Sequence, residues 1–190
     1  RCLHPSFHQW GANTGRFSCS NPNLQNVSND ETSGGENVVN VRQVFVPRNE
    51  HVWLSFDYQQ LELRIFASRA NEERMLDAFR CGRDIHDETR RAVLPLLPDK
   101  QGRKIAKNIN FLKVFGGGAG TLSAKYDVPI GESKEFLSRY SREFPRIDEY
   151  IQEQTREAAK KGYIINAFNR KLYIDPDKPY IATNYDVQSS

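Results

Sequence analysis

Two cations and two aromatic rings recur at steps of four in this chain, and no other pattern constrains its folding as strongly. They are Arg103, Lys107, Phe111 and Phe115. The spacing predicts an α-helix over 102–115, because residues four apart lie along one helix face. Two cations at that spacing repel each other, so the face favours an external anion such as a nucleoside triphosphate. The pattern also fits a solvated basic face beside a core aromatic pair.

The charge balance is compatible with a polyanionic partner without requiring one. The 190 residues carry a net charge of +3, and a net positive charge favours association with nucleic acid. The segment 100–113 is rich in Lys and Arg and contains no acid. The three cysteines, Cys2, Cys19 and Cys81, are too few and too scattered for a disulfide framework, which indicates a reducing compartment. No apolar run approaches the roughly 20 residues that span a membrane.

Two further patterns carry little chemical signal. The candidate zinc ligands Cys2, His4, His8 and Cys19 match no common spacing of a structural zinc site. The glycine-rich run 116–120 lacks the Lys-Ser/Thr ending of a phosphate-binding loop and follows a helix instead of a strand. It therefore predicts a flexible turn or a hinge.

Predicted strands lie near both ends of the chain, with helices between them. Strands are predicted over 38–46 and 51–58 and a hairpin over 163–174, and residues 28–37 are expected to form an exposed loop. Helices are predicted over 60–79, 84–93, 102–115, 131–142 and 146–161, the last capped by Gly162. This order favours an α+β fold in which a sheet-bearing base carries a helical insertion.

Asp57 ends the second predicted strand, directly before a helix. A carboxylate at that place can hold Mg²⁺ through oxygen, with the backbone carbonyl of Tyr58 as a further ligand. A helix cap or a turn residue fits the same position. Glu62 follows in the first turns of the helix, where the helix dipole by itself favours an acid. His86, taken alone, fits a structural histidine.

These segments resemble the ordered motifs of family A DNA polymerases over nearly the whole chain. Thr14-Gly15-Arg16 and Asn21–Asn26 resemble the first motif, Asp57–Arg64 motif A, Gly82–His86 the segment after it, Arg103–Gly116 motif B on the O helix, Gly162-Tyr163 and Arg170 the later hairpin, and Asn184–Gln188 the return into the palm. The glycine run after the O helix looks more like phage versions of the family.

The resemblance implies a right-hand polymerase architecture, with an incomplete palm sheet and an inserted, mainly helical fingers lobe. Residues 1–60 would be the first part of the palm, 61–180 the fingers, and 181–190 the return into the palm. The implied activity is template-directed addition of deoxynucleoside monophosphates to a primer 3′-hydroxyl with two Mg²⁺ ions. The implied partners are primer–template DNA and deoxynucleoside triphosphates, without a membrane, in a monomeric cytoplasmic enzyme of a bacterium or a phage-infected host.

The resemblance also implies a role for each candidate residue. Asp57, with Tyr58, would ligate the metal ions, and Arg103 and Lys107 would clamp the triphosphate. Glu62 would crowd a ribose 2′-hydroxyl. The implied nucleotide-binding set is Arg103, Lys107, Phe111, Phe115, Glu62, Gln60 and His86. The implied DNA-binding set is Arg16, Gln25, Asn26, Arg170 and Gln188.

The chain departs from the family pattern at several positions. Phe115 replaces a usual Tyr, which predicts weaker exclusion of ribonucleotides, and Phe111 implies discrimination against dideoxynucleotides. Leu112 replaces a small residue, and Cys2 stands where an Arg is frequent. No second His-Asp-Glu motif follows Gln188, so the second metal-binding Asp is missing and the isolated chain is expected to be nearly inactive. The triplet that starts at His86 lies on a predicted helix and is not expected to supply that Asp.

Two other functions stay open at this point. Glu62 and the Gln25-Asn26 pair argue against a single-subunit RNA polymerase. A non-catalytic nucleic-acid-binding module is less favoured because a pure binder needs no carboxylate, such as Asp57, facing phosphates.

Overall fold

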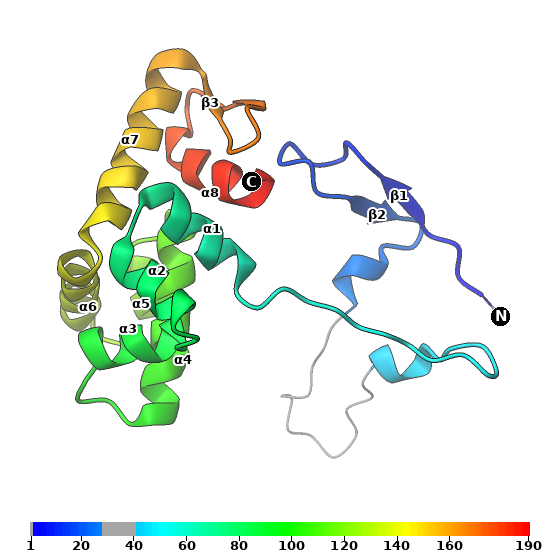
Figure 1. Ribbon diagram of the computed structural model, residues 1–190, viewed down its shortest axis with the longest axis horizontal. Helices are drawn as coiled ribbons and strands as arrows, with labels where there is room; N and C mark the ends of the chain where they lie inside the picture. Colours follow the sequence, from blue (N-terminus) through cyan, green and yellow to red (C-terminus); the bar gives the residue numbers. More distant parts are fainter. Residues whose placement is uncertain (1, 28–40) are drawn as a thin grey trace. The chain divides into compact units, whose positions relative to one another are not determined.

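The computed structural model describes residues 2–27 and 41–190 (Figure 1). The chain divides into two compact units, Arg1–Gln59 (unit 1) and Gln60–Ser190 (unit 2). The predicted loop 28–37 and the start of the first predicted strand lie outside the described residues.

Unit 1 contains one small antiparallel sheet. Strand β1 (Ser6–His8) pairs with β2 (Ser18–Ser20), and Phe7 lies opposite Cys19. Two short 3-10 helices follow, η1 (Leu24–Asn26) and η2 (Val41–Val44). Among the described residues of this unit, Cys19 is the one buried hydrophobic side chain. The apolar residues of unit 1 that the structure describes therefore do not form a core of their own.

The predictions of strands over 38–46 and 51–58 are wrong where the structure describes these residues. The first segment contains η2, and the second has no regular secondary structure. A strand needs a partner for its backbone hydrogen bonds, and in the described residues the paired strands are β1 with β2 and β3 with β4. The alternating side chains of 51–58 are exposed on both sides, with Phe56 at 89%. Alternation alone did not establish a buried face.

Unit 2 is mainly helical. Its elements are α1 (Leu61–Ala70), α2 (Glu73–Arg80), α3 (Ile85–Val93), α4 (Asp99–Val114), α5 (Ala119–Tyr126), α6 (Ile130–Glu143), α7 (Pro145–Lys161), β3 (Tyr163–Ile165), β4 (Lys171–Tyr173), η3 (Pro179–Ile181) and α8 (Ala182–Ser189). The α+β prediction is confirmed in part, since helices dominate and both sheets are two-stranded. No helix in the described residues has the length and apolar character needed to cross a membrane.

The helix predictions in unit 2 are confirmed except at one break. The predicted helix 60–79 is two helices, because Asn71 adopts a left-handed conformation (φ 52°) and Glu72 caps α2 by accepting a bond from the Arg74 amide. The glycine-rich turn is shorter than predicted, since α5 begins inside it at Ala119. The hairpin is confirmed, as is the Gly162 cap at φ 73°.

Apolar packing fixes which face of α4 points outward. Ile105, Ile109 and Val114 are fully or nearly fully buried in the main core of unit 2, which leaves the 103–107–111–115 stripe on another face. Helix α4 packs so closely on α3 that a Cβ on Gly102 would come within 3.0 Å of the Arg90 side chain. Helix α7 contacts α1, β3 and α8 and joins the two ends of the unit.

Candidate functional site

The outward face of α4 carries the four residues that the sequence singled out. Arg103 and Lys107 are exposed, Phe111 is half-buried and Phe115 is 44% exposed. The rings of Phe111 and Phe115 stack, with centroids 6.2 Å apart and planes 18° apart. Cations and rings therefore form one continuous surface. The helix predicted over 102–115 is confirmed by α4.

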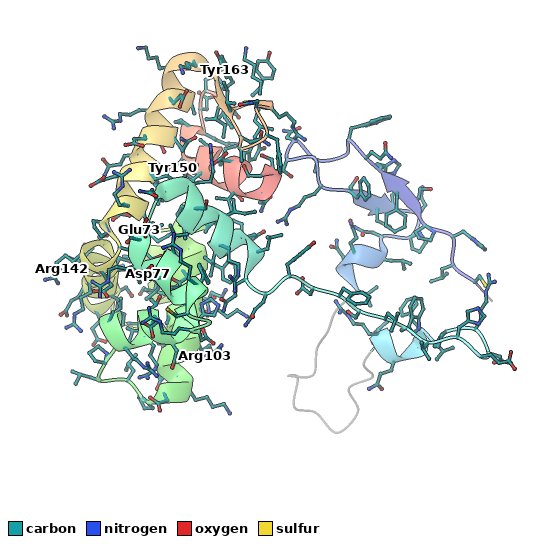
Figure 2. All side chains as sticks on the ribbon, viewed as in Figure 1. Glu73, Asp77, Arg103, Arg142, Tyr150 and Tyr163 are labelled. Carbon is teal, nitrogen blue, oxygen red and sulfur yellow. The ribbon has the colours of Figure 1, made fainter. Side chains whose placement is uncertain are left out.

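Arg103 is held by a carboxylate from the start of α3. Its Nη2 donates to Asp84 Oδ2 at 2.5 Å, and Figure 2 labels Arg103 on α4. Asp84 also caps α3, since it accepts a bond from the His86 amide at 2.8 Å. Burial opposes its charge, but Arg103 and this amide lower the pKa of Asp84 overall. Because the pair is largely exposed, it contributes about 0–1 kcal/mol, so a stronger anion can replace Asp84.

Lys107 lies one turn further along α4. It makes no hydrogen bond or ion pair with any residue that the structure describes. Its ammonium is therefore available to an anion on the same face as Arg103.

A buried polar network lies beneath this face. His86 and Asn110 are almost fully buried, and His86 Nδ1 lies 3.0 Å from Asn110 Nδ2 in a hydrogen bond. The Thr89 hydroxyl donates to Asn110 Oδ1 at 3.1 Å. The His86 ring is 6.1 Å from the Phe111 ring. The sequence left His86 as structural or nucleotide-binding, and in the structure its ring is almost fully buried and contacts the Phe111 ring.

The environment of His86 predicts that the stability of unit 2 depends on pH. Burial lowers the pKa of His86, and Arg103 and Lys107 add to the effect while Asp84 opposes it. Below the ordinary histidine pKa of about 6.5, the unfolded chain therefore binds more protons than the folded chain. The stability of the folded state then decreases as the pH is lowered.

We expect the thermal midpoint to drop by several degrees between about pH 7 and about pH 5.5. Calorimetry of the chain and of His86→Phe measures this, and the variant should lose most of the drop. Equal pH slopes for the two proteins would show that His86 is not responsible.

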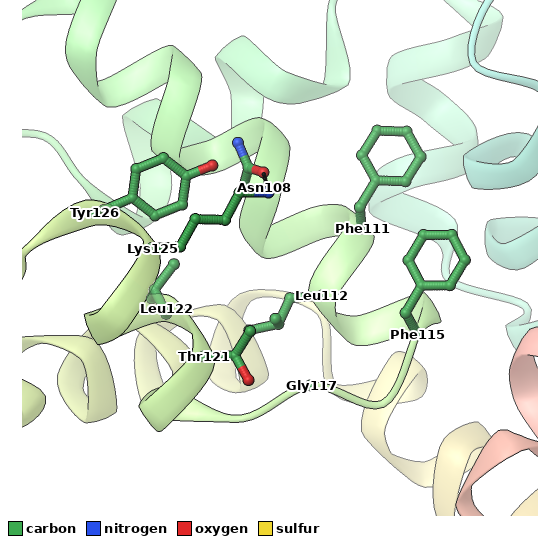
Figure 3. Close-up of a pocket in the computed structure, with 9 residues that line it drawn as sticks. All are labelled: Asn108, Phe111, Leu112, Phe115, Gly117, Thr121, Leu122, Lys125 and Tyr126. Atoms are coloured by element: carbon green, nitrogen blue, oxygen red, sulfur yellow. Dashed lines mark hydrogen bonds between the residues drawn. The ribbon is translucent and has the colours of Figure 1, made fainter. Parts of the chain in front are cut away.

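A cleft of about 540 Å³ lies between α4 and α5 (Figure 3). Phe111, Leu112 and Phe115 line one side, and Lys125 and Tyr126 line the other. Leu112, the bulky residue at a position where a small one was expected, packs directly on the glycine turn. A Cβ on Gly117 would come 2.3 Å from Leu112 Cδ1, so the turn needs glycine because Leu112 fills the space.

The basic segment 100–113 is not one surface. Lys113 is only 14% exposed, and its Nζ donates to Asp148 of α7 at 2.6 Å. It also lies over the ring of buried Tyr140. Lys113 therefore fixes α4 to α7, and its role is structural.

The candidate metal ligands lie in unit 1, and the candidate nucleotide-binding residues Gln60 and Glu62 lie in unit 2. Asp57 and Tyr58 are exposed in unit 1, whereas Gln60 and Glu62 are half-buried at the start of unit 2. Gln60 adopts a left-handed conformation (φ 57°) just before α1. In residues 2–27 and 41–190, no group of three His, Cys, Asp or Glu side chains is placed to hold a metal.

Two of the alternative metal-ligand candidates, Asp87 and Cys19, make contacts within the fold. Asp87 accepts bonds from Arg90 and Arg91 at 3.1 and 3.0 Å. In the candidate zinc set, buried Cys19 donates through Sγ to the Pro22 carbonyl. These groups are engaged within the fold.

The DNA-binding candidates also fall in both units. Arg16, Gln25 and Asn26 are exposed in unit 1, and Gln25 Nε2 donates to the Phe17 carbonyl at 3.0 Å. Arg170 is exposed in the β3–β4 turn and Gln188 is half-buried on α8.

Sequence reasoning missed Asp84 and Asn110 as parts of the site. An Asp directly before an apolar-periodic helix is a capping signal that could have identified Asp84. The contact of Asn110 with α3 had no such signal.

Comparisons with known proteins agree on one family. The profile described as DNA polymerase family A matches residues 1–190. The thermostable DNA polymerase I of Thermus aquaticus is 35% identical over 183 residues, which cover 92% of this chain and 21% of the relative. The DNA polymerase of Mycobacterium phage D29 is 36% identical over 152 residues, which cover 79% of this chain and 25% of the relative.

A solved structure has the same fold. It is the POL domain of Pol1 from M. smegmatis in complex with DNA primer-template and dNTP, with a TM-score of 0.79 and 24% identity. The match covers 98% of this chain and 34% of that chain. The chain thus spans about a fifth to a quarter of the length of the curated relatives.

Proposed function

The chain belongs to DNA polymerase family A, and we propose that it forms the nucleotide-binding part of a template-directed DNA polymerase. The observation that carries this proposal is the outward face of α4. On this face Lys107 has no hydrogen-bond or ion-pair partner among the described residues, Arg103 forms an exposed ion pair with Asp84, and the rings of Phe111 and Phe115 stack. The names of the curated relatives support the activity.

In this proposal the architecture is that of a right hand. Residues 1–60 belong to the palm, 61–180 form the fingers with α4 as the O helix, and 181–190 return to the palm. The likeness to a polymerase domain over nearly the whole chain supports the assignment.

Arg103 and Lys107 act on the triphosphate by position and charge. They lie one turn apart on α4, so two phosphates of one nucleotide can each meet a cation. Phosphoryl transfer depends mainly on such positioning and electrostatic stabilisation. Arg103 exchanges its ion pair with Asp84 for one with phosphate. Lys107 has no ion pair with a described residue to break before it binds phosphate.

The rings and Glu62 select the nucleotide. Phe111 packs on the incoming sugar and base, supported by His86 from below, and Phe115 stacks beside it. Glu62 and Gln60 lie at the start of α1 and face the sugar, where Glu62 crowds a 2′-hydroxyl.

Asp57 and the Tyr58 carbonyl are the groups that would hold Mg²⁺. Both are oxygen ligands, and Mg²⁺ usually takes one or two carboxylates together with water and substrate phosphates. The exposed Asp57 carboxylate fits that donor set. A bound ion would supply positive charge against the phosphates and the primer oxygen. The proposal has two ions in the complete enzyme, and it does not assign Asp87 as a ligand.

Primer extension tests the proposed function. The protein that carries this chain should extend a primer on a DNA template with deoxynucleotides and select the complementary base. Duplex binding without extension would favour the non-catalytic module. Extension that uses ribonucleotides as readily would favour the RNA polymerase.

Phe115→Tyr should raise the preference for deoxynucleotides over ribonucleotides by about tenfold. The added hydroxyl can donate a hydrogen bond to the Glu62 carboxylate and hold it where it crowds a 2′-hydroxyl. Single-nucleotide incorporation gives the ratio of kcat/KM values for the two sugars. Phe7→Tyr adds the same hydroxyl to an exposed ring of unit 1 and should leave the ratio unchanged. An unaltered ratio for Phe115→Tyr would remove this position from sugar selection.

A further inference from the structure

A carboxylate with no solvent access lies on α8 of unit 2. Asp186 of α8 is 0% exposed, and Arg69 of α1 donates through Nε to its Oδ2 at 2.8 Å. The hydroxyl of Tyr150 on α7, labelled in Figure 2, donates to the same oxygen. Three helices that are distant in sequence therefore meet at one atom. None of these residues belongs to the nucleotide-binding or DNA-binding sets.

The protonation states of the donors keep this cluster intact. Burial raises the pKa of Tyr150, and the Asp186 carboxylate raises it further. Burial opposes the charge of Arg69, but its hydrogen bond to Asp186 raises the pKa of Arg69 overall. Both groups therefore stay protonated and continue to donate to Asp186 around neutral pH.

The cluster continues from α8 into the β3–β4 hairpin. Arg69 Nη2 donates to the Ile165 carbonyl at 3.1 Å. Ser190 Oγ donates to Asp186 Oδ1 at 3.3 Å and accepts a bond from the Ala167 amide at 3.0 Å. The end of α8 and the hairpin are thus bonded to the same carboxylate and its arginine.

One asparagine completes the connection to the proposed DNA contacts. Asn166 Nδ2 donates to the Ser189 carbonyl at 2.8 Å, and its Oδ1 accepts a bond from the Arg170 amide at 2.8 Å. Ser189 follows Gln188 directly. The backbones that carry Gln188 and Arg170 are therefore held together through Asn166 and the Asp186 cluster.

Apolar packing alone defines the rotation of α8 weakly. Its buried apolar residues are only Ala182 and Val187. A buried ion pair often adds little net stability compared with well-packed apolar residues, although its bonds are directional. We propose that Asp186, Arg69 and Tyr150 form a positioning cluster that holds Gln188 and Arg170 in the arrangement that a primer–template duplex requires. This inference rests on the proposed function.

An apolar replacement separates positioning from stability. Arg69→Met, Tyr150→Phe and Asp186→Leu combined should keep the thermal midpoint near or above that of the unchanged chain, because the buried Tyr150 hydroxyl is not left without an acceptor. Its affinity for a primer–template duplex, from fluorescence anisotropy, should still fall about tenfold. In a Gln188→Ala/Arg170→Ala background the same replacement should cost less than about twofold, because the residues it positions are gone. Full affinity, or an equal loss in both backgrounds, would overturn the proposal.

Hydrogen exchange decides the point without DNA. Tyr150→Phe removes one donor and should speed amide exchange about tenfold in residues 163–189 while leaving α4 unchanged. Asp77→Asn, which breaks an exposed ion pair with Arg80, is the control and should change neither region. Unchanged exchange in 163–189 would refute the positioning cluster. If Gln188→Ala/Arg170→Ala alone leaves duplex affinity intact, the proposed DNA contact fails, and exchange still decides the cluster.

Discussion

Asp57→Asn should slow primer extension by about 10³-fold or more in the protein that carries this chain, while duplex binding is retained. The substitution keeps the size of the side chain but removes the negative charge from the oxygen that would hold Mg²⁺. An amide is a weaker ligand for a hard cation than a carboxylate. Single-turnover extension measures the rate, and anisotropy measures duplex affinity on the same samples.

The control for Asp57→Asn is Asp77→Asn, the same chemical change at an exposed position on α2. It should leave extension within about twofold, as surface substitutions usually do. If Asp57→Asn extends at the normal rate, Asp57 is not a ligand of a catalytic ion. The position would then be a turn between the two units, and the non-catalytic module would gain support.

Lys107→Ala should weaken the binding of deoxynucleoside triphosphates about 100-fold. A charge-assisted bond to phosphate contributes about 1.5–3 kcal/mol, and Lys107 has no partner among the described residues that must first be released. The measurement is the concentration of nucleotide that gives half-maximal single-turnover incorporation. Duplex affinity should change little, because the face of α4 is assigned to the nucleotide.

Lys104→Ala is the matched control, since it removes the same charge from the same helix. Lys104 follows Arg103 directly and lies off the 103–107–111–115 stripe. Lys104 is exposed, and its loss should weaken nucleotide binding by no more than about threefold through long-range charge. Equal losses for the two lysines would mean that nucleotide binding depends on the net charge of α4 and not on its stripe.

The helix α4 and its outward face could be predicted from the sequence because the information is local. Steps of four residues define one face of a helix, and buried Ile105 and Ile109 turn that face outward. The cap at Gly162 and the hairpin after it were likewise marked by residues adjacent in sequence. Family membership was predictable because the motifs occur in order over nearly the whole chain, and it is confirmed by the family profile.

The remaining features depend on contacts between distant residues. The ion pair between Lys113 and Asp148 joins α4 to α7, and nothing near Lys113 in the sequence distinguishes it from a solvated lysine. The Asp186 cluster brings together positions 69, 150 and 186 in the same way. The strand prediction over 51–58 failed because alternation describes side chains, whereas a strand also needs a partner for its backbone.

The face of α4 should bind the triphosphate of a nucleotide. An NMR titration of the chain with a deoxynucleoside triphosphate and Mg²⁺, following the resonances of α4, tests this binding. Shifts should concentrate at Arg103, Lys107 and Phe111 and disappear in Lys107→Ala. Inorganic triphosphate should shift the two cations without the ring. Saturating nucleotide that leaves these resonances unchanged, or shifts only residues outside α4, would contradict the account.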